Sequence, residues 1–294
     1  MIKNLLIGIA FAILWSSASS ATKIGLMSAQ PLFLTNIRFF IAAILMLGFA
    51  YFVQKSRIPE GKEWQQLIIY GFLNVTAYLG FYFLAMQHVS AGIGSLSTAT
   101  NPIFISIMTA IWMSRPIKTL EIFGLVFGIV GVGIATYPLL QNSIADVQGL
   151  ILLGISMLCY SVGTVYYASR KWTLSLLAIN GWQIFFGGIL LLPFTLFLLD
   201  WSKNTFDLRF YGSLFWLIVP VSIGAVQLWL YLLRIDPVKA SLWLFLCPIF
   251  GFGFAYILLD EPITIYTGVG TLCVIVGLYL AQREKFVRVA SKKS

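Results

Sequence analysis

Two basic residues, Lys23 and Arg38, stand inside long apolar stretches of the sequence. An ionised side chain in such surroundings is costly unless a partner binds it. Arg38 can hold a carboxylate through two parallel hydrogen bonds, and Lys23 can draw an anion to the mouth where a substrate enters. The alternative is structural: Lys23 then reaches toward lipid headgroups, and Arg38 binds backbone carbonyls.

A stripe of small polar residues runs through a further apolar stretch at three- and four-residue steps, which places it on one face of a helix. Its members are Ser90, Gly94, Ser97, Thr98 and Asn101. In the second half of the chain, the positions that match the last four hold Ala240, Trp243, Leu244 and Cys247. The two patterns predict one polar and one aromatic wall of a cavity, although small residues also serve close helix packing.

Aromatic and amide side chains deep in other apolar stretches complete the set that we expect to contact a substrate. The set is Trp15, Ser19, Arg38, Tyr78, Ser97, Asn101, Tyr160, Trp182, Gln183 and Trp243. Such a cavity suits a molecule with a polar end and an apolar side chain. Pro102, Pro220 and Pro248 each remove a backbone hydrogen bond and predict kinks, which either shape the cavity or bend during gating.

Several kinds of chemistry have no residues to carry them. No Asp or Glu lies deep in an apolar stretch, and the one histidine, His88, falls in a short connection, so a buried proton relay is not expected. The three cysteines, Cys159, Cys247 and Cys273, read as small buried hydrophobes, and no metal site or other cofactor is predicted. A Walker A motif is absent, so ATP is not the expected driver.

The alternatives from other functional classes are a membrane-embedded enzyme and a channel. An enzyme needs a nucleophile with a base, or a metal set, and the sequence has no Gly-x-Ser-x-Gly or His-Glu-x-x-His motif. A channel needs a selectivity filter, and no such stretch is recognisable. We therefore expect neither an enzyme nor a channel.

Membrane-spanning helices are the elements that must hold these residues. Of the 294 residues, 60% are hydrophobic and only 10% are charged, against about 25% charged in soluble domains, so a soluble enzyme is excluded. Ten apolar runs have about the 20-residue length of a spanning helix. They cover residues 5–26, 33–53, 66–87, 90–112, 120–139, 148–168, 174–199, 211–233, 238–259 and 263–282.

The net charge of +9 is interpreted as an orientation signal rather than a nucleic-acid footprint. With a cytoplasmic N-terminus, ten spans leave 15 of the 19 basic residues on the cytoplasmic side, as the positive-inside rule requires. Loss of residues 5–26 as a signal peptide would invert the pattern, so this segment is expected to stay as a helix. The expected location is a bacterial inner membrane, with both termini cytoplasmic.

An internal repeat divides the chain into residues 1–142 and 143–294. At an offset of 146, residues 102–135 match the second half at 11 of 34 positions, including Pro102, Pro116 and Gly124. Shared hydrophobicity does not explain aligned prolines and glycines. Because each repeat holds five spans, the second copy enters the membrane from the opposite side. Inverted repeats are typical of secondary transporters, whose substrate site lies between the halves.

The order of short motifs along the chain points to a known family. They are Leu14-Trp15-Ser16 with Lys23, Arg38-Phe39, Asn101-Pro102-Ile103-Phe104, and Leu258-Leu259-Asp260-Glu261-Pro262. With these motifs, ten spans and the inverted repeat, the chain resembles the EamA-type branch of the drug/metabolite transporter superfamily. One departure is that the acidic residue before the last helix of each repeat is Glu261 in the second copy but Arg115 in the first.

The resemblance implies an all-helical membrane protein in which eight helices surround a central cavity and the fifth and tenth spans support them from outside. It also implies transport of small polar or amphiphilic metabolites such as amino acids. We therefore expect a secondary transporter, with export as the favoured direction and alternating access as the mechanism. The expected partners are a small-molecule substrate and the lipid bilayer, without nucleic acid; the oligomeric state is open and a monomer is compatible with the sequence.

Overall fold

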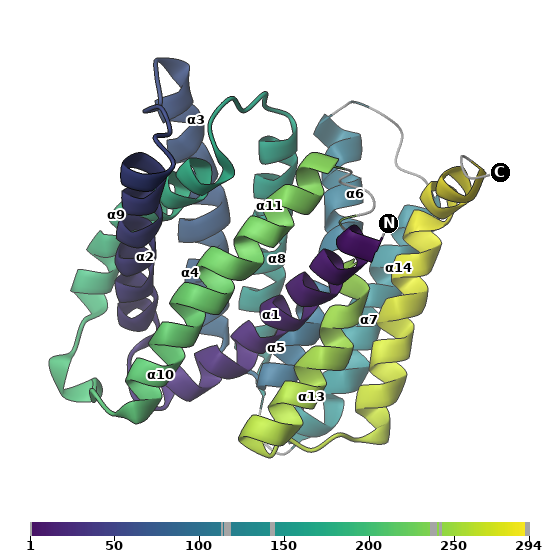
Figure 1. Cartoon of the computed structure of the whole chain (residues 1–294). Helices are drawn as coiled ribbons and strands as arrows, with labels where there is room; N and C mark the ends of the chain where they lie inside the picture. The colour runs from purple at the N-terminus through teal and green to yellow at the C-terminus, as the bar shows by residue number, and fades with distance from the viewer. Residues whose placement is uncertain are drawn as a thin grey trace.

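The computed structural model describes residues 2–112, 114, 119–141, 145–235, 240 and 243–291, and these form helices joined by short connections (Figure 1). No strand occurs within these ranges. The elements of the first half are α1 (Ile2–Leu26), α2 (Pro31–Gly48), η1 (Phe49–Val53), α3 (Lys62–Gly71), η2 (Phe72–Ala77), α4 (Tyr78–Ala85), α5 (Ala91–Thr98), α6 (Asn101–Trp112) and α7 (Thr119–Gln141). Those of the second half are α8 (Val147–Ala168), α9 (Leu176–Leu198), η3 (Trp201–Lys203), α10 (Leu208–Trp216), η4 (Leu217–Ala225), α11 (Val226–Ile235), η5 (Trp243–Leu246), α13 (Cys247–Leu259) and α14 (Ile265–Ser291).

Six helices of the described chain are long and apolar enough to cross a membrane. They are Asn4–Leu26, Pro31–Val53, Lys62–Ala85, Val147–Ala168, Leu176–Leu198 and Leu208–Ile235. Three of the other predicted spans correspond to shorter apolar helices, Ile122–Ala135, Cys247–Leu259 and Ile265–Gly277. The fold is therefore that of a helical multi-pass membrane protein, and the boundary predicted between residues 142 and 143 lies outside the described residues.

The predicted fourth span is two helices rather than one. At the end of α5 the hydroxyls of Ser97, Thr98 and Thr100 bond to backbone carbonyls three residues earlier, at 2.8, 2.7 and 2.6 Å. Such bonds compete with the helical ladder. Pro102 then stands in the first turn of α6, where its missing N–H costs nothing. The equivalent Pro248 likewise follows a tight turn, η5, in the first turn of α13.

Contacts between helices repeat when the two halves are exchanged. Helix α1 packs on α13, and its counterpart α8 packs on α6; α8 also packs on η2, as α1 does on η4. Corresponding spans also meet directly, as α2 does with α9, and as α5 of the fourth span does with α13 of the ninth. The α5–α13 crossing is close because a Cβ on Gly251 would lie 1.8 Å from Ser95 Oγ. The structure thus fits a two-repeat architecture.

Helices α7 and α14 lie side by side along one edge of the bundle (Figure 1). Glycines allow their backbones to meet: a Cβ on Gly131 would lie 2.6 Å from the Gly270 carbonyl oxygen, and one on Gly277 would lie 2.7 Å from that of Gly124. Small residues allow this kind of approach in membranes. The pair packs outside the helices that surround the candidate site.

Candidate functional site

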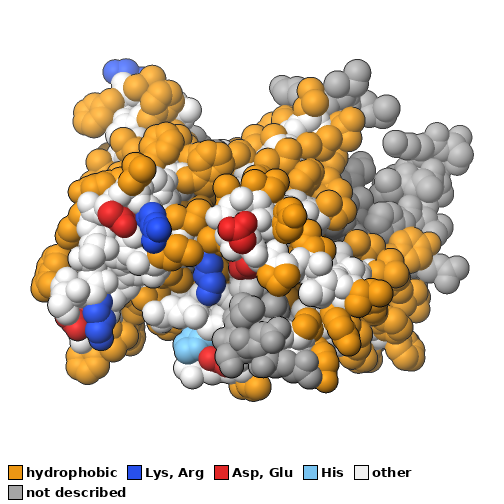
Figure 2. Space-filling view, turned by 90° about the horizontal axis from the view of Figure 1, so that it is seen from below, with side chains coloured by type: hydrophobic (Ala, Val, Ile, Leu, Met, Phe, Trp, Pro, Cys, Tyr) orange, Lys and Arg blue, Asp and Glu red, His pale blue; other side chains and the backbone are white. Residues whose placement is uncertain are grey.

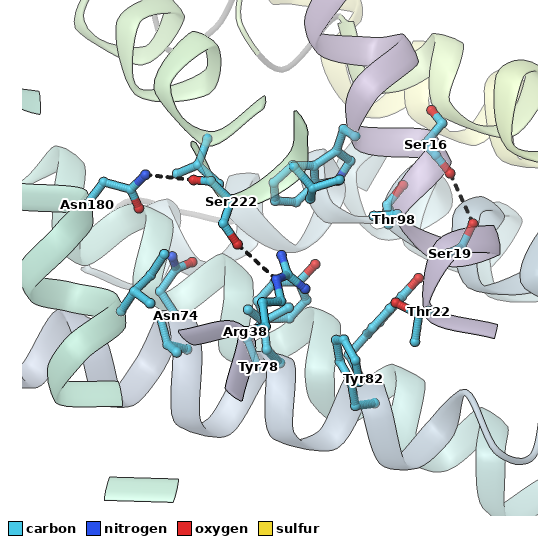
Figure 3. Close-up of a pocket in the computed structure, with 18 of the residues that line it drawn as sticks. Ser16, Ser19, Thr22, Arg38, Asn74, Tyr78, Tyr82, Thr98, Asn180 and Ser222 are labelled. Atoms are coloured by element: carbon cyan, nitrogen blue, oxygen red, sulfur yellow. Dashed lines mark hydrogen bonds between the residues drawn. The ribbon is translucent and has the colours of Figure 1, made fainter. Parts of the chain in front are cut away.

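A cavity lies at the interface between the two repeats, surrounded by α1, α2, α4, α5, α9, α11 and the π-helical segments η2 and η4 (Figure 3). Its polar wall includes side chains from both halves of the chain, among them Thr22, Arg38, Asn74, Asn180 and Ser222. Aromatic and aliphatic side chains such as Trp15, Phe83 and Ile184 complete it. We call it the central cavity.

Among the described residues, Arg38 is the one ionised residue that lines the central cavity, and it is only 4% exposed. Its Nε donates a hydrogen bond of 2.8 Å to Ser222 Oγ (Figure 3). Its guanidinium carbon lies 5.8 Å from the ring centroids of both Phe39 and Phe83. No carboxylate of the described residues forms an ion pair with it. A buried cation without a counter-ion costs several kcal/mol, so an anion that arrives with the substrate would be favourable here.

Side-chain amides next to Arg38 form a directed chain of hydrogen bonds. Asn74 Nδ2 donates to Gln183 Oε1 at 2.9 Å, and Gln183 Nε2 donates to Asn180 Oδ1 at 2.9 Å. Asn180 Nδ2 then donates to the Ser222 carbonyl oxygen, also at 2.9 Å. Gln183 Oε1, Asn180 Oδ1 and the Ser222 carbonyl oxygen thus each accept one of these bonds, whereas Asn74 Oδ1 accepts none from a described residue. The chain fixes the wall that carries Ser222, and through Ser222 it positions the Arg38 guanidinium.

Two π-helical segments supply this wall. Asn74 lies on η2 and Ser222 on η4, which occupy corresponding places in the two repeats. A π-helical turn inserts one extra residue into a helix, redirects the side chains around it, and is frequent at functional sites. Pro220 lies inside η4 and cannot donate a backbone hydrogen bond. The proline that the sequence marks as a kink therefore stands beside Ser222, the residue that holds Arg38.

Hydroxyl groups around Arg38 are free to donate. Thr22 Oγ1 is buried and has no hydrogen-bond partner, and no described residue forms a hydrogen bond with the phenol oxygen of Tyr78 or Tyr82. In Figure 3 both tyrosines lie beside Arg38, with Thr22 next to Tyr82. The Ser222 hydroxyl accepts from Arg38, so its own hydrogen remains available. This part of the cavity is rich in donors.

The structure brings half of the predicted binding residues into the central cavity. Trp15, Ser19, Arg38, Tyr78 and Gln183 line it. Ser19 Oγ donates to the Ser16 carbonyl of its own helix at 3.0 Å, and Gln183 belongs to the amide chain. Arg38 and Gln183 meet the cavity from α2 and α9.

The other five predicted residues do not line the cavity. Tyr160 is buried directly behind it, with its ring 4.8 Å from Tyr78 and 6.0 Å from Trp15. Ser97 bonds to its own helix, and Asn101 is fully buried at the start of α6, with neither side-chain amide atom paired.

The two predicted tryptophans have other neighbours. Trp182 donates to the Tyr51 hydroxyl at 2.6 Å and packs on Trp64. Trp243 covers the glycine at position 8, since a Cβ there would lie 1.9 Å from its ring. Of the polar and aromatic walls predicted from the fourth and ninth spans, Thr98 alone lines the cavity, next to Ser95, which was not part of the predicted stripe.

Lys23 lies outside the central cavity, in the last turn of α1. Its Nζ donates to the Met86 carbonyl oxygen at 2.7 Å, at the end of α4, and Glu261 is close enough to attract it electrostatically. Glu261 in turn accepts from the backbone N–H groups of Ala91 and Gly92, at 2.6 and 2.9 Å, at the start of α5. A carboxylate suits a helix N-terminus, and a cation suits a C-terminus. Arg115, the repeat equivalent of Glu261, lies outside the described residues.

Figure 2 views this end of the helices, where charged side chains are scattered over the face and hydrophobic ones dominate its margin. A larger hollow of about 490 Å³ opens between α1, α10 and α13, lined by exposed apolar residues such as Ile257 and Leu258. That groove has almost no polar atoms and is suited to lipid. The central cavity is smaller, about 50 Å³, below the roughly 300–1,000 Å³ of ligand pockets. A ligand of the usual size would therefore fit only if the surrounding helices moved apart.

Several cavity residues were not among those predicted, and the three that build the hydrogen-bonded wall around Arg38 are Asn74, Asn180 and Ser222. Each is a polar residue in the interior of an apolar run, which is the signal that would have found them. Ser222 has a second signal, because it stands two residues after Pro220. Without the structure, however, neither signal shows that Ser222 contacts Arg38.

Comparisons with known proteins cover nearly the whole chain. A family model described as the EamA-like transporter family matches residues 2–137 and 147–282. A Bacillus subtilis protein named "Uncharacterized transporter YoaV" is 25% identical over 95% of this chain and 97% of its own. An Escherichia coli protein named "Probable amino-acid metabolite efflux pump" is 23% identical over 95% and 94%. A solved crystal structure shares the fold, with a TM-score of 0.66 over 96% of both chains at 16% identity.

Proposed function

Because the chain belongs to the EamA-like transporter family, we propose that it is a secondary transporter of small amphiphilic metabolites that carry a carboxylate, a class that includes amino acids. The observation that carries the proposal is Arg38, a buried cation in the cavity wall that has no protein counter-ion among the described residues. A substrate carboxylate would supply that counter-ion, and the guanidinium offers parallel donors for it. The name of the Escherichia coli relative, "Probable amino-acid metabolite efflux pump", supports the same substrate class.

Alternating access is the proposed mechanism. The substrate site lies between two repeats, and the cavity is too narrow for a metabolite unless its walls separate. The breaks between α5 and α6 and between η5 and α13, together with η2 and η4, offer points where the helices bend. Substrate would enter from one side, neutralise Arg38 in a closed state and leave when the repeats rock the other way.

The proposed arrangement in the membrane has ten spans, with α5–α6 and η5–α13 each counted as one. Hydrogen bonds gather basic segments at one end of the bundle: Arg57 donates to Thr173, and Arg234 donates to the Leu174 carbonyl at 2.9 Å. Basic loops favour the cytoplasmic side. We assign this end to the cytoplasm, the membrane to the bacterial inner membrane, and the net direction to export.

Counterflow in proteoliposomes tests the proposal. Purified protein is reconstituted into vesicles loaded with an unlabelled carboxylate amphiphile, and uptake of the same labelled compound is followed. We expect saturable exchange that Arg38→Gln reduces and that Arg209→Gln preserves, because Arg209 lies in the apolar groove and not in the cavity. Absence of exchange for every amino acid and carboxylate tried, together with hydrolysis of a lipid or peptide, would contradict a carrier.

A further inference from the structure

From the charge and the hydrogen-bond polarity of the central cavity, we infer that it selects a net anion, a carboxylate on an apolar body without an ammonium group, over the corresponding zwitterion. The inference rests on the proposed transport function and narrows its substrate class. It separates organic acids from amino acids, which differ by one charged group.

The charge of the cavity lining favours an anion. The residues that line the cavity include one arginine and no Asp, Glu or His. A carboxylate brings the site to neutrality, whereas a zwitterion brings a positive charge as well and leaves the total at +1. A charge buried without a partner is unfavourable, so the ammonium group of an amino acid would need acceptors that compensate for it.

Hydrogen-bond acceptors in the cavity wall belong largely to the amide chain. Gln183 Oε1, Asn180 Oδ1 and the Ser222 carbonyl each already accept from a neighbouring amide, and Ser222 Oγ accepts from Arg38. An ammonium donor would share these oxygens with the existing bonds, since each can accept a second one, and Asn74 Oδ1 accepts no bond from a described residue. Because the amide chain also positions Arg38, such sharing would disturb the carboxylate site itself.

Hydrogen-bond donors of the cavity gather around Arg38. The guanidinium nitrogens of Arg38 other than Nε have no hydrogen bond to a described residue, and Thr22 Oγ1 is buried and unpaired. With the phenols of Tyr78 and Tyr82, these groups offer protons to the same region (Figure 3). Donors of this number suit two carboxylate oxygens, each of which accepts more than one hydrogen bond.

The apolar part of the lining can hold the apolar chain of a substrate. Trp15, Leu79, Phe83 and Val226 give the cavity apolar lining as well as the donors. An aliphatic or aromatic chain attached to the carboxylate can pack there, while a polar ammonium next to the carboxylate would have to share this surface. The predicted substrate is therefore a monocarboxylic acid with an apolar chain.

Two matched sets of compounds test the inference. One set is 4-methylpentanoate, leucine and 3-methylbutylamine, and the other is 3-phenylpropanoate, phenylalanine and 2-phenylethylamine. The three compounds of a set share one apolar body. The first carries only the carboxylate, the second carries the carboxylate and the ammonium group, and the third carries only the ammonium group. Binding is measured by thermal stabilisation of the detergent-solubilised full chain, and transport is measured by counterflow in proteoliposomes.

We expect the acid of at least one set to bind at least tenfold more tightly than its amino acid, and the amine to be weakest. Arg38→Gln should abolish the preference, Arg38→Lys should retain part of it, and Arg209→Gln should leave it unchanged. Unliganded thermal unfolding shows whether each variant is folded. An amino acid or amine that binds as well as the acid would overturn the anion inference and leave the carrier proposal intact. Failure of all six compounds to bind or exchange would overturn both.

Discussion

Lys23 and Arg38 lie on consecutive helices and carry the same charge, yet the structure surrounds them differently. Lys23 has a carbonyl acceptor at the end of α4 and an acidic neighbour, Glu261, that also binds the start of α5. Arg38 has one neutral hydroxyl partner, Ser222, and aromatic rings. One cation is compensated by the protein and the other is not.

This difference in partners distinguishes a charged residue that stabilises the fold from one that can bind a ligand. A compensated cation ties segments together, since Lys23 and Glu261 join α1, the α4–α5 connection and the turn before α14. An uncompensated buried cation lowers stability and is useful only if a ligand completes it. The sequence presents both residues as candidates for binding an anion, whereas their contacts favour the proposed substrate role for Arg38 and a connecting role for Lys23.

Replacement of Arg38 by Met is expected to have the largest effect on transport. It removes the buried charge and keeps most of the side-chain volume, so the protein should be at least as stable as the wild type. Carboxylate transport should fall about 10- to 100-fold, because a hydrogen bond to a charged group contributes about 1.5–3 kcal/mol. Thermal unfolding and counterflow on the same preparation measure both. A large loss of stability would mean that Arg38 is structural and would remove the contrast with Lys23.

Replacement of Glu261 by Gln should mainly reduce stability. It weakens two hydrogen bonds at the start of α5 and removes the acidic neighbour of Lys23, which we expect to cost about 1–2 kcal/mol. The melting temperature in detergent should fall by several degrees while the substrate KM changes little. Asp260→Asn is the matched control. Asp260 precedes Glu261 in the chain and is exposed, and Asn tolerates the left-handed backbone conformation of Asp260, φ 52°. An unchanged melting temperature for Glu261→Gln would contradict a connecting role.

Replacement of Ser222 by Ala tests the single hydrogen bond that holds Arg38. The Asn180 bond to the Ser222 carbonyl remains possible, so the amide chain should survive. We expect a rise of about fivefold in the substrate KM, corresponding to about 1 kcal/mol for the lost bond. Ser213→Ala is the control, since its buried hydroxyl bonds only to the Phe210 carbonyl of its own helix. Equal effects of the two variants on KM would show that the Ser222–Arg38 bond has no special role.

The sequence predicts the family, the helical membrane fold and some of the cavity residues for identifiable reasons. Apolar runs, basic loops and repeated prolines are local signals, and each is visible without knowing which helices touch. Arg38 and Gln183 stand out for the same reason, because a strongly polar side chain inside an apolar run is unusual.

The rest of the site depends on helix rotation and on contacts between distant segments. Trp243 looks like a cavity wall by repeat position, but it instead packs where Gly8 leaves room on α1. The fourth span loses its continuous polar face because α5 and α6 are separate helices. Ser222 becomes a partner of Arg38 only because η4 turns it toward α2, and neither residue's local sequence specifies that meeting.

Replacement of Lys23 by Gln should have a smaller effect than the three preceding substitutions. A neutral amide still reaches toward the Met86 carbonyl, and a half-buried charge near Glu261 contributes at most about 1 kcal/mol. Transport should stay within about twofold of the wild type, with a melting temperature lowered by a few degrees at most. A drop in carboxylate transport comparable to that of Arg38→Met would instead make Lys23 part of the anion path, as the sequence suggests.

Replacement of Asp146 is expected to have the smallest effect on stability, and that effect should depend on pH because the charge of Asp146 is compensated in the folded protein. Hydrogen bonds from the Gly149 backbone N–H and from His88 lower the pKa of this exposed carboxyl, which caps α8. Because the pKa is lower in the folded than in the unfolded state, the stabilisation is present above about pH 4, the pKa of free Asp, and is lost as the pH falls through the folded-state value. Asp146→Asn should therefore lower the melting temperature slightly at pH 7, and this difference should shrink as the pH falls below about 4. A difference that stays constant as the pH falls would mean that the cap acts through geometry and not through its charge.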